Sequence, residues 1–176
     1  AAIAYGLQET DAEKIALVYD LGGGTFDVSL VDVFEGSLEI RSSAGEIFLG
    51  GEDFTTSMMS RILQRRGYVL ETCELRHPLM VSRLRRECEL AKRRLSSEAE
   101  AVVRMPETDG RFADPPETEV VRQEEFAEWT NHVLSRVEDP LRRALGDAGM
   151  KRKDIDEVVL VGGATRMATV IDRIRE

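Results

Sequence analysis

Residues 19–27 read YDLGGGTFD, a run in which three successive glycines separate two apolar stretches. The preceding residues 15–20, IALVYD, form a short apolar run rich in strand-forming residues. Residues 26–34, FDVSLVDVF, alternate apolar and polar side chains, and residues 36–45, GSLEIRSSAG, alternate again. The pattern predicts three consecutive strands joined by short turns, an antiparallel meander with Asp20 at the end of its first strand.

The glycine run has the features of a phosphate-binding turn. Three successive glycines permit backbone conformations closed to other residues, and they let N–H groups approach a phosphate without interference from a Cβ atom. Asp20 is suited to holding a hydrated magnesium ion, and Thr25 offers a hydroxyl to a phosphate or a cation. The run is not a P-loop, because it lacks a Gly-Lys-Thr or Gly-Lys-Ser ending and leads into a strand. The alternative is a glycine-rich hairpin turn with two solvated carboxylates, Asp20 and Asp27.

Helices and one hairpin follow the meander. Residues 48–67 predict a loop that enters a helix, because a double glycine precedes apolar residues at helical spacing. The basic segment 78–95 predicts a long helix, and 98–122 predicts two short strands around a polar turn. Two helical patterns occupy 122–148, and 154–176 predicts a strand, a glycine turn and a helix.

This order of elements fits an α/β core that carries an inserted subdomain. We expect the core to comprise residues 1–66 and 123–176, and the inserted subdomain to comprise residues 67–122. Residues 1–10, AAIAYGLQET, start with apolar residues and have no capping residue. They predict the tail of a helix that begins further upstream, in a longer protein.

Composition excludes several classes of protein. The chain has 176 residues, 42% of them hydrophobic, which is enough for an ordinary core. Its net charge of -9 argues against a nucleic-acid partner, because phosphate-backbone binding needs an excess of basic residues. No stretch reaches the ~18 apolar residues of a membrane span, and no signal-peptide pattern is present, so we expect a cytoplasmic protein. The two cysteines and two histidines are isolated, which predicts reduced thiols and no zinc-type cluster.

Two more glycine turns are candidates for ligand contacts. Residues 162–166, GGATR, lie between the apolar strand VVLV and an amphipathic helix, where their backbone can lie against a base or a phosphate. Arg166 can stack on an aromatic ring. Residues 50–53, GGED, form a loop that can present Glu52 to a ribose hydroxyl. A tight packing turn and a plain helix start are the respective alternatives.

The basic helix carries a fourth candidate group. Glu89, Lys92, Arg93 and Ser96 lie within reach of one another at i+3 and i+4 spacing. A carboxylate, aliphatic stems and a guanidinium plane can together enclose a nucleoside, although charge runs on helices are often only solvated faces. Cys88 adjoins this cluster, where a lowered pKa is conceivable, but a buried inert thiol is the favoured interpretation.

Four of these motifs, in this order and spacing, resemble the seventy-kilodalton heat-shock chaperone family of DnaK type, within the actin and sugar-kinase ATPase superfamily. They are YDLGGGTFDVSL, AGEIFLGGEDF, LRRECELAKRRLSS and VVLVGGATRM, and AAIAYGL is similar to the family's connecting helix. The resemblance covers nearly the whole chain. It implies an α/β, actin-like ATPase (ribonuclease H-like) fold with a mixed sheet, in which the chain is the second lobe: core subdomain IIA with an inserted α+β subdomain IIB.

The resemblance also implies ATP or ADP as ligand, with Mg²⁺ and, as a further candidate, K⁺. The first glycine turn would hold the β- and γ-phosphates, the second would approach the ribose, and the last would close over adenosine opposite the basic helix. Asp20 would contact hydrated magnesium and Asp27 would assist there. The implied nucleotide-binding residues are Gly22, Gly23, Gly24, Thr25, Gly51, Glu52, Glu89, Lys92, Arg93, Ser96, Gly162, Gly163, Ala164 and Arg166.

By the same resemblance, the full-length protein would couple ATP hydrolysis to peptide binding and protein folding. Its partners would be J-domain cochaperones, nucleotide-exchange factors and unfolded peptides. The family's first phosphate loop, phosphate-binding lysine and catalytic glutamate lie N-terminal to position 1, so we expect the isolated chain to lack ATPase activity. The alternatives are a filament-forming or division protein of the superfamily, a small-molecule kinase, or a binding module without a nucleotide role.

Overall fold

The computed structural model describes residues 13–34 and 37–175. The helix tail expected at 1–10 and the turn expected at residues 35–36 therefore lie outside the described residues. The chain forms two compact units: the first runs up to Gly51 and includes Val133–Thr165, and the second comprises Glu52–His132 and the chain from Arg166 onward. The subdomain boundaries expected at 66/67 and 122/123 stay predictions.

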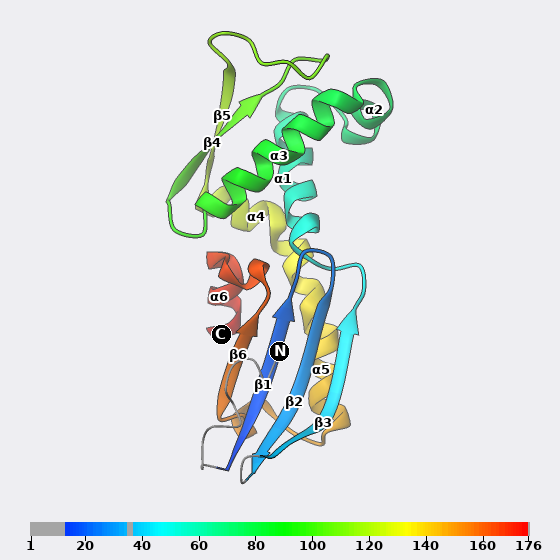
Figure 1. Ribbon diagram of the computed structural model, residues 1–176, viewed down its shortest axis with the longest axis vertical. Helices are drawn as coiled ribbons and strands as arrows, with labels where there is room; N and C mark the ends of the chain where they lie inside the picture. Colours follow the sequence, from blue (N-terminus) through cyan, green and yellow to red (C-terminus); the bar gives the residue numbers. More distant parts are fainter. Residues whose placement is uncertain (1–12, 35–36, 176) are drawn as a thin grey trace. The chain divides into compact units, whose positions relative to one another are not determined.

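A four-stranded mixed sheet forms the first unit, in the order β3-β2-β1-β6 (Figure 1). β1 pairs antiparallel with β2, and β2 pairs antiparallel with β3, which confirms the predicted meander. β6 pairs with β1 in parallel, which makes the sheet mixed. The strands are β1 (Lys14–Leu21), β2 (Phe26–Phe34), β3 (Ser37–Glu46) and β6 (Glu157–Val161).

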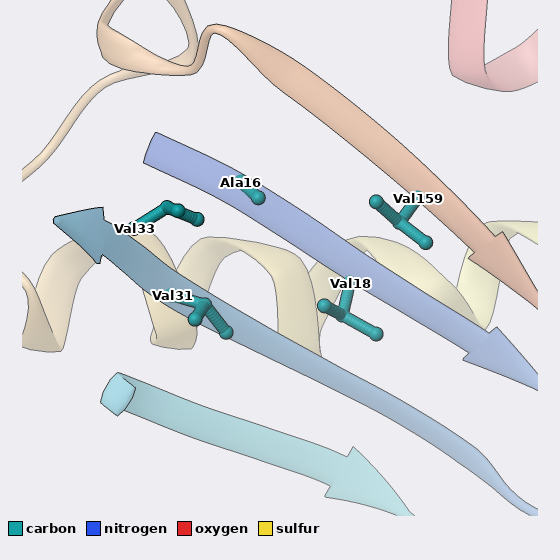
Figure 2. Packing of buried hydrophobic residues seen from close by; sticks show 5 residues of the cluster. All are labelled: Ala16, Val18, Val31, Val33 and Val159. Atoms are coloured by element: carbon teal, nitrogen blue, oxygen red, sulfur yellow. The ribbon is translucent and has the colours of Figure 1, made fainter. Parts of the chain in front are cut away.

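Both faces of the central strands are buried. Successive side chains of a strand point to opposite faces, so an uninterrupted apolar run such as that of β1 supplies two cores. On one face lies the cluster drawn in Figure 2, whose members are Ala16, Val18, Val31, Val33 and Val159. The sheet thereby holds the end of β1 rigidly, and this end leads into the first glycine turn.

A helix packs against the opposite side of the meander. α5 (Glu138–Asp147) contacts β2 and β3, and the Ser42 hydroxyl donates a hydrogen bond of 2.7 Å to the carbonyl oxygen of Ala144. Ser42 pairs with Leu30, which is fully buried, so α5 covers the face on which Leu30 lies. The sheet consequently has two apolar faces, as the α/β class requires.

The second unit combines helices with a two-stranded hairpin. β4 and β5 pair antiparallel, as predicted for 98–122, and α3 packs against β4 (Figure 1). α3 has proline at its first helical position and Lys92, Arg93 and Arg94 in its last turn, both favourable placements. Besides α5 and β6, the helices and strands from α1 onward are α1 (Gly51–Arg65), α2 (Leu70–Arg76), α3 (Pro78–Arg94), β4 (Glu100–Met105), β5 (Glu117–Arg122), α4 (Gln123–Leu134) and α6 (Ala168–Arg175).

Ion pairs attach the hairpin to the helices. Arg104 on β4 donates two hydrogen bonds, of 2.9 and 2.8 Å, to the carboxylate of Glu87 on α3. The side chain of Glu87 is only 8% exposed, and the Arg104 guanidinium also lies 4.8 Å from the centre of the Phe112 ring. These hydrogen bonds keep the pKa of Glu87 below its ordinary value, although burial opposes the shift. The pair therefore fixes α3 on the hairpin.

Candidate functional site

The first glycine turn, residues 22–25, joins β1 to β2 and is open to solvent. The Gly22 N–H donates to the Thr25 carbonyl oxygen at 2.9 Å, and Gly23, Gly24 and Thr25 are exposed. A Cβ atom added to Gly23 or Gly24 would meet no atom within 4 Å. None of the three glycines has a positive φ, so this turn does not use the left-handed conformations that glycine permits. Their open main chain, rather than their φ angles, suits them to a phosphate.

The start of α1 packs directly on this turn. The Gly51 N–H donates to the Gly22 carbonyl oxygen at 2.9 Å. A Cβ atom on Gly50 would lie 2.4 Å from main-chain atoms of both Gly23 and Gly24, a distance that no side chain tolerates. Glycine at position 50 is therefore required for the close approach of the two segments. Glu52 is exposed in the first helical turn, where a carboxylate is favoured.

The third glycine turn meets the same end of the sheet. Because β6 runs parallel to β1, the residue after β6, Gly162, lies beside the end of β1. Gly162 has a φ of 88°, and a Cβ atom there would lie 2.2 Å from the carbonyl oxygen of Leu21 and 3.0 Å from Asp20 Oδ1. Both constraints demand glycine. The structure thus brings the first and third turns together at the end of β1, and it places Gly50 and Gly51 against the first turn.

A short 3-10 turn, η5 (Gly163–Arg166), carries the other residues expected in this turn. The Thr165 hydroxyl donates to the Gly162 carbonyl oxygen at 2.7 Å and stabilises the bend. Gly163 and Arg166 are exposed, whereas Ala164 is buried. Gly163 and Arg166 are therefore accessible for a ligand contact, whereas Ala164 is not.

Two carboxylates belong to directly paired residues at the open end of the meander. Asp20 on β1 pairs directly with Asp27 on β2, so both side chains lie on the same face of the sheet. Asp20 is half-buried and Asp27 is exposed. Like charges directly opposite one another are unfavourable, and a cation between them would remove the repulsion. A hydrated magnesium ion fits this pair, because Mg²⁺ keeps several waters and takes one or two carboxylates.

Larger metal-binding groups are missing from the part of the chain that the structure describes. No group of three or more histidine, cysteine, aspartate or glutamate side chains is suitably placed within residues 13–34 and 37–175.

The second unit holds the predicted charged cluster on α3. Glu89 Oε2 lies 2.6 Å from Lys92 Nζ, and Glu89 Oε1 accepts a hydrogen bond of 2.9 Å from Arg93 Nε. Burial alone would raise the pKa of the Glu89 carboxyl, but hydrogen bonds from Lys92, Thr55 and Arg93 bring it below the ordinary value. Lys92 is 6% exposed, so this part of α3 is not merely a solvated face.

Ser96 and Cys88 border this cluster in different ways. Ser96 is half-buried in the turn after α3, and its N–H donates to the Arg93 carbonyl oxygen at 3.3 Å. Cys88 is fully buried, and burial together with the neighbouring Glu87 charge raises the pKa of its thiol to about 12. Cys73 is buried and free as well. The inert-thiol interpretation of Cys88 is confirmed, and the alternative of a lowered pKa is wrong.

Thr55 belongs to the cluster, although no sequence pattern identified it as a member. It lies on α1 and is 2% exposed, and its hydroxyl contacts both Glu89 and Lys92. Its separations from them, 34 and 37 positions along the chain, follow no helical or strand period. No signal in the sequence alone links it to α3.

Comparisons with known proteins agree over the whole chain. A model of the family described as Hsp70 protein matches residues 1–176. The chaperone protein DnaK of Anaplasma marginale (strain St. Maries) is 39% identical over 181 residues, which cover 100% of this chain and 28% of that protein. The chaperone protein DnaK of Mycoplasma mobile is 35% identical over 176 residues, covering 99% of this chain and 29% of that protein. The chain therefore spans less than a third of the length of these relatives.

The mixed α/β sheet with its glycine turns is part of an actin-like ATPase fold, as the family match shows. The chain belongs to the Hsp70 family, and it corresponds to part of the nucleotide-binding domain of a DnaK-type chaperone. The resemblance found in the sequence is thereby confirmed. Within the described residues, no helix is both long and apolar enough to cross a membrane.

Proposed function

We propose that this chain binds ATP or ADP together with Mg²⁺. The observation that carries the proposal is the packing of the glycine turns around Asp20 in the first unit. Gly50 and Gly162 stand where any side chain would strike the main chain of the first turn or of β1, while Gly23 and Gly24 remain open. Exposed main chain next to a carboxylate suits a phosphate group and its magnesium ion.

Asp20 and Asp27 are the proposed contacts of the metal. Asp20 would hold hydrated Mg²⁺, which brings positive charge to the phosphates, and Asp27 would assist, with K⁺ as a second ion at this end of the sheet. Thr25, at the end of the first turn, would add its hydroxyl. The placement of two carboxylates on paired residues of adjacent strands supports this assignment, because a cation would offset their like charges.

The charged cluster of the second unit is proposed to contact the nucleoside. The Arg93 side chain is 74% exposed, so its guanidinium plane is free to stack on a base. Glu89 is one-third exposed, which leaves its carboxylate accessible to a ribose hydroxyl. Ser96 would join this contact, and Glu52 and Gly51 would approach the ribose. Gly163 and Arg166 would lie against the other side of adenosine.

For the longer protein, we propose a chaperone role, which is the role that the name of its DnaK relatives describes. Nucleotide would favour one arrangement of the ATPase domain and hydrolysis would release it, which would couple ATP turnover to the binding of unfolded peptides. J-domain cochaperones and nucleotide-exchange factors are the proposed protein partners, and the cytoplasm is the proposed location.

Titration calorimetry with ADP and Mg²⁺ tests the proposal, with Gly23→Ala as the decisive variant. The added methyl group meets no atom within 4 Å and Gly23 has no positive φ, so the variant should fold normally. The methyl group would, however, occupy the open space in front of the turn. We expect ADP affinity to fall at least tenfold, a loss of about 1.4 kcal/mol.

Gly146→Ala is the matched control. Gly146 lies on α5, and a Cβ atom there would also meet nothing within 4 Å. Alanine in a helix is favourable, so this variant should bind ADP as the unaltered chain does and unfold at slightly higher denaturant. Absence of ADP binding by the unaltered chain, or equal binding by the Gly23→Ala variant, would refute the proposed role of the turn.

A further inference from the structure

A buried threonine hydroxyl closes a triangle of polar contacts in the second unit. Thr55 Oγ1 lies 2.8 Å from Glu89 Oε2 and 2.9 Å from Lys92 Nζ. The third side of the triangle is the ion pair between Glu89 Oε2 and Lys92 Nζ, at 2.6 Å. Thr55 comes from α1, whereas Glu89 and Lys92 come from α3, so the hydroxyl connects two helices at this point.

The chemistry of the hydroxyl fits both contacts at once. A threonine hydroxyl has one hydrogen to donate and two lone pairs that accept. Its hydrogen goes to the carboxylate of Glu89, and one lone pair accepts from the ammonium group of Lys92. Threonine has two main rotamers in a helix, and the two hydrogen bonds favour the one that places the hydroxyl beside Glu89 and Lys92. Thr55 thus fixes the position of two flexible side chains.

Ordering the side chains of Glu89 and Lys92 before a ligand arrives lowers the entropic cost of binding. Glutamate and lysine lose substantial rotamer freedom when they are ordered, and this loss weakens binding if it occurs only when the ligand arrives. At 2% exposed, Thr55 is too deeply buried to touch a ligand itself. It would act through Glu89, whose side chain is one-third exposed, and through Lys92, which pairs with Glu89.

We propose that Thr55 is a positioning residue, whose hydroxyl orients Glu89 and Lys92 for contact with the nucleoside. The inference rests on the proposed nucleotide-binding function. It predicts a selective effect: Thr55 influences recognition of the nucleoside, while the glycine turns continue to recognise the phosphates. Arg93 contacts the other carboxylate oxygen of Glu89, so its ion pair does not depend on the hydroxyl directly.

The first experiment compares two probes, ADP with Mg²⁺ and inorganic tripolyphosphate with Mg²⁺, by titration calorimetry on the full chain. Valine has nearly the shape of threonine but lacks the hydroxyl. We expect Thr55→Val to weaken ADP binding roughly five- to tenfold, because two hydrogen bonds that order the cluster are lost. Tripolyphosphate affinity should change less than twofold. Thr55→Ser keeps the hydroxyl and should restore most of the ADP affinity.

Thr56→Val is the matched control, one residue further along α1. The Thr56 hydroxyl accepts a hydrogen bond of 3.0 Å from Arg85, which lies outside the triangle, so this variant removes a comparable bond elsewhere. It should leave ADP affinity unchanged. An equal loss in the Thr56→Val variant, or a parallel loss of tripolyphosphate affinity in the Thr55→Val variant, would mean that Thr55 is merely structural.

A second measurement needs no nucleotide. Carbon-detected NMR titration of Glu89 should show a higher carboxyl pKa in the Thr55→Val variant, because one of the hydrogen bonds that lower it is lost. Thr56→Val should leave this pKa unchanged. An unchanged Glu89 pKa in Thr55→Val would overturn the inference even in a chain that binds no nucleotide.

The two proposals therefore fail separately. If the unaltered chain binds neither ADP nor tripolyphosphate, the proposed function is wrong, and the Glu89 titration still tests the triangle. If the unaltered chain binds ADP and the Thr55→Val variant binds it equally well, only the positioning role is wrong.

Discussion

The two groups of candidate site residues differ in the atoms that form their contacts: main-chain atoms in the first unit and side-chain atoms in the second. In the first unit, glycine turns pack so closely that the main chain itself forms the surface, and Gly50 and Gly162 leave no room for a Cβ atom. In the second unit, the side chains of Glu89, Lys92 and Thr55 are held together by hydrogen bonds and charge. Substitutions should therefore act on the first group through steric strain, and on the second through lost polar contacts.

Gly162→Ala should have the largest effect on stability, because its methyl group would clash directly with main-chain atoms. Its methyl group would lie 2.2 Å from the Leu21 carbonyl oxygen, and the φ of 88° is itself unfavourable for alanine. We expect the free energy of unfolding to fall by about 2–5 kcal/mol, measured by urea denaturation.

Gly149→Ala separates the two causes of that loss. Gly149 has a φ of 66°, but a Cβ atom there would meet nothing within 4 Å. This control should cost only the backbone strain, about 1–2 kcal/mol. Equal losses in the two variants would show that close packing at Gly162 contributes nothing.

Glu87→Gln should have the next largest effect, because it weakens the side-chain contacts that hold α3 on the hairpin. Loss of the charged bidentate hydrogen bond to Arg104 should lower the free energy of unfolding by about 1–3 kcal/mol in urea denaturation at pH 7. Glu74→Gln is the control: the Glu74–Arg85 pair is longer, at 3.7 Å, and more exposed, so its loss should be nearly neutral.

The pH dependence of the same variant gives an independent check. The folded-state pKa of Glu87 lies below its ordinary value of 4.5, so folding favours the ionised form. Its contribution is fully present above the unfolded-state pKa and is lost as the pH falls from about 4.5 through the lowered folded-state pKa. The Glu87→Gln variant should lose less stability on acidification than the unaltered chain. A parallel decline in both would contradict this account of the pair.

Asp27→Asn should have the smallest effect on stability, with the opposite sign. Without Mg²⁺, removal of one of the two facing carboxylates should raise the free energy of unfolding by about 0.2–1 kcal/mol. With ADP present, the increase of affinity with Mg²⁺ should become weaker. Glu98→Gln, which also removes one exposed negative charge, should change neither quantity. A stability loss in the Asp27→Asn variant without Mg²⁺ would argue against repulsion between the carboxylates.

Most secondary-structure elements were predictable because their patterns are strong. The meander has alternating strands, the hairpin has two short apolar runs, and α1 and α3 have apolar residues at helical spacing. α2 was not predicted, and the physical reason is its composition. It has seven residues, and only Leu70 and Cys73 are buried among charged neighbours, which is too short a pattern to show helical periodicity.

The glycine turns were predicted from the sequence, but the positions at which glycine is sterically required were not. Residues 22–24 permit unusual backbone angles and the approach of a phosphate without a Cβ atom, and the structure has no positive φ there. The strongest demands for glycine are at Gly50 and Gly162, where segments distant in sequence approach closely. Such approaches depend on the pairing of β6 with β1 and on the start of α1, which a local motif does not reveal.

The sequence by itself determined the family, the order of the elements and the three glycine turns, because local periodicity and turn residues report on the backbone near them. Only the tertiary structure decided which glycines are sterically required, that Asp20 faces Asp27, and that Thr55 connects Glu89 to Lys92. These relations arise from strand register and helix packing, which bring together residues far apart in the chain.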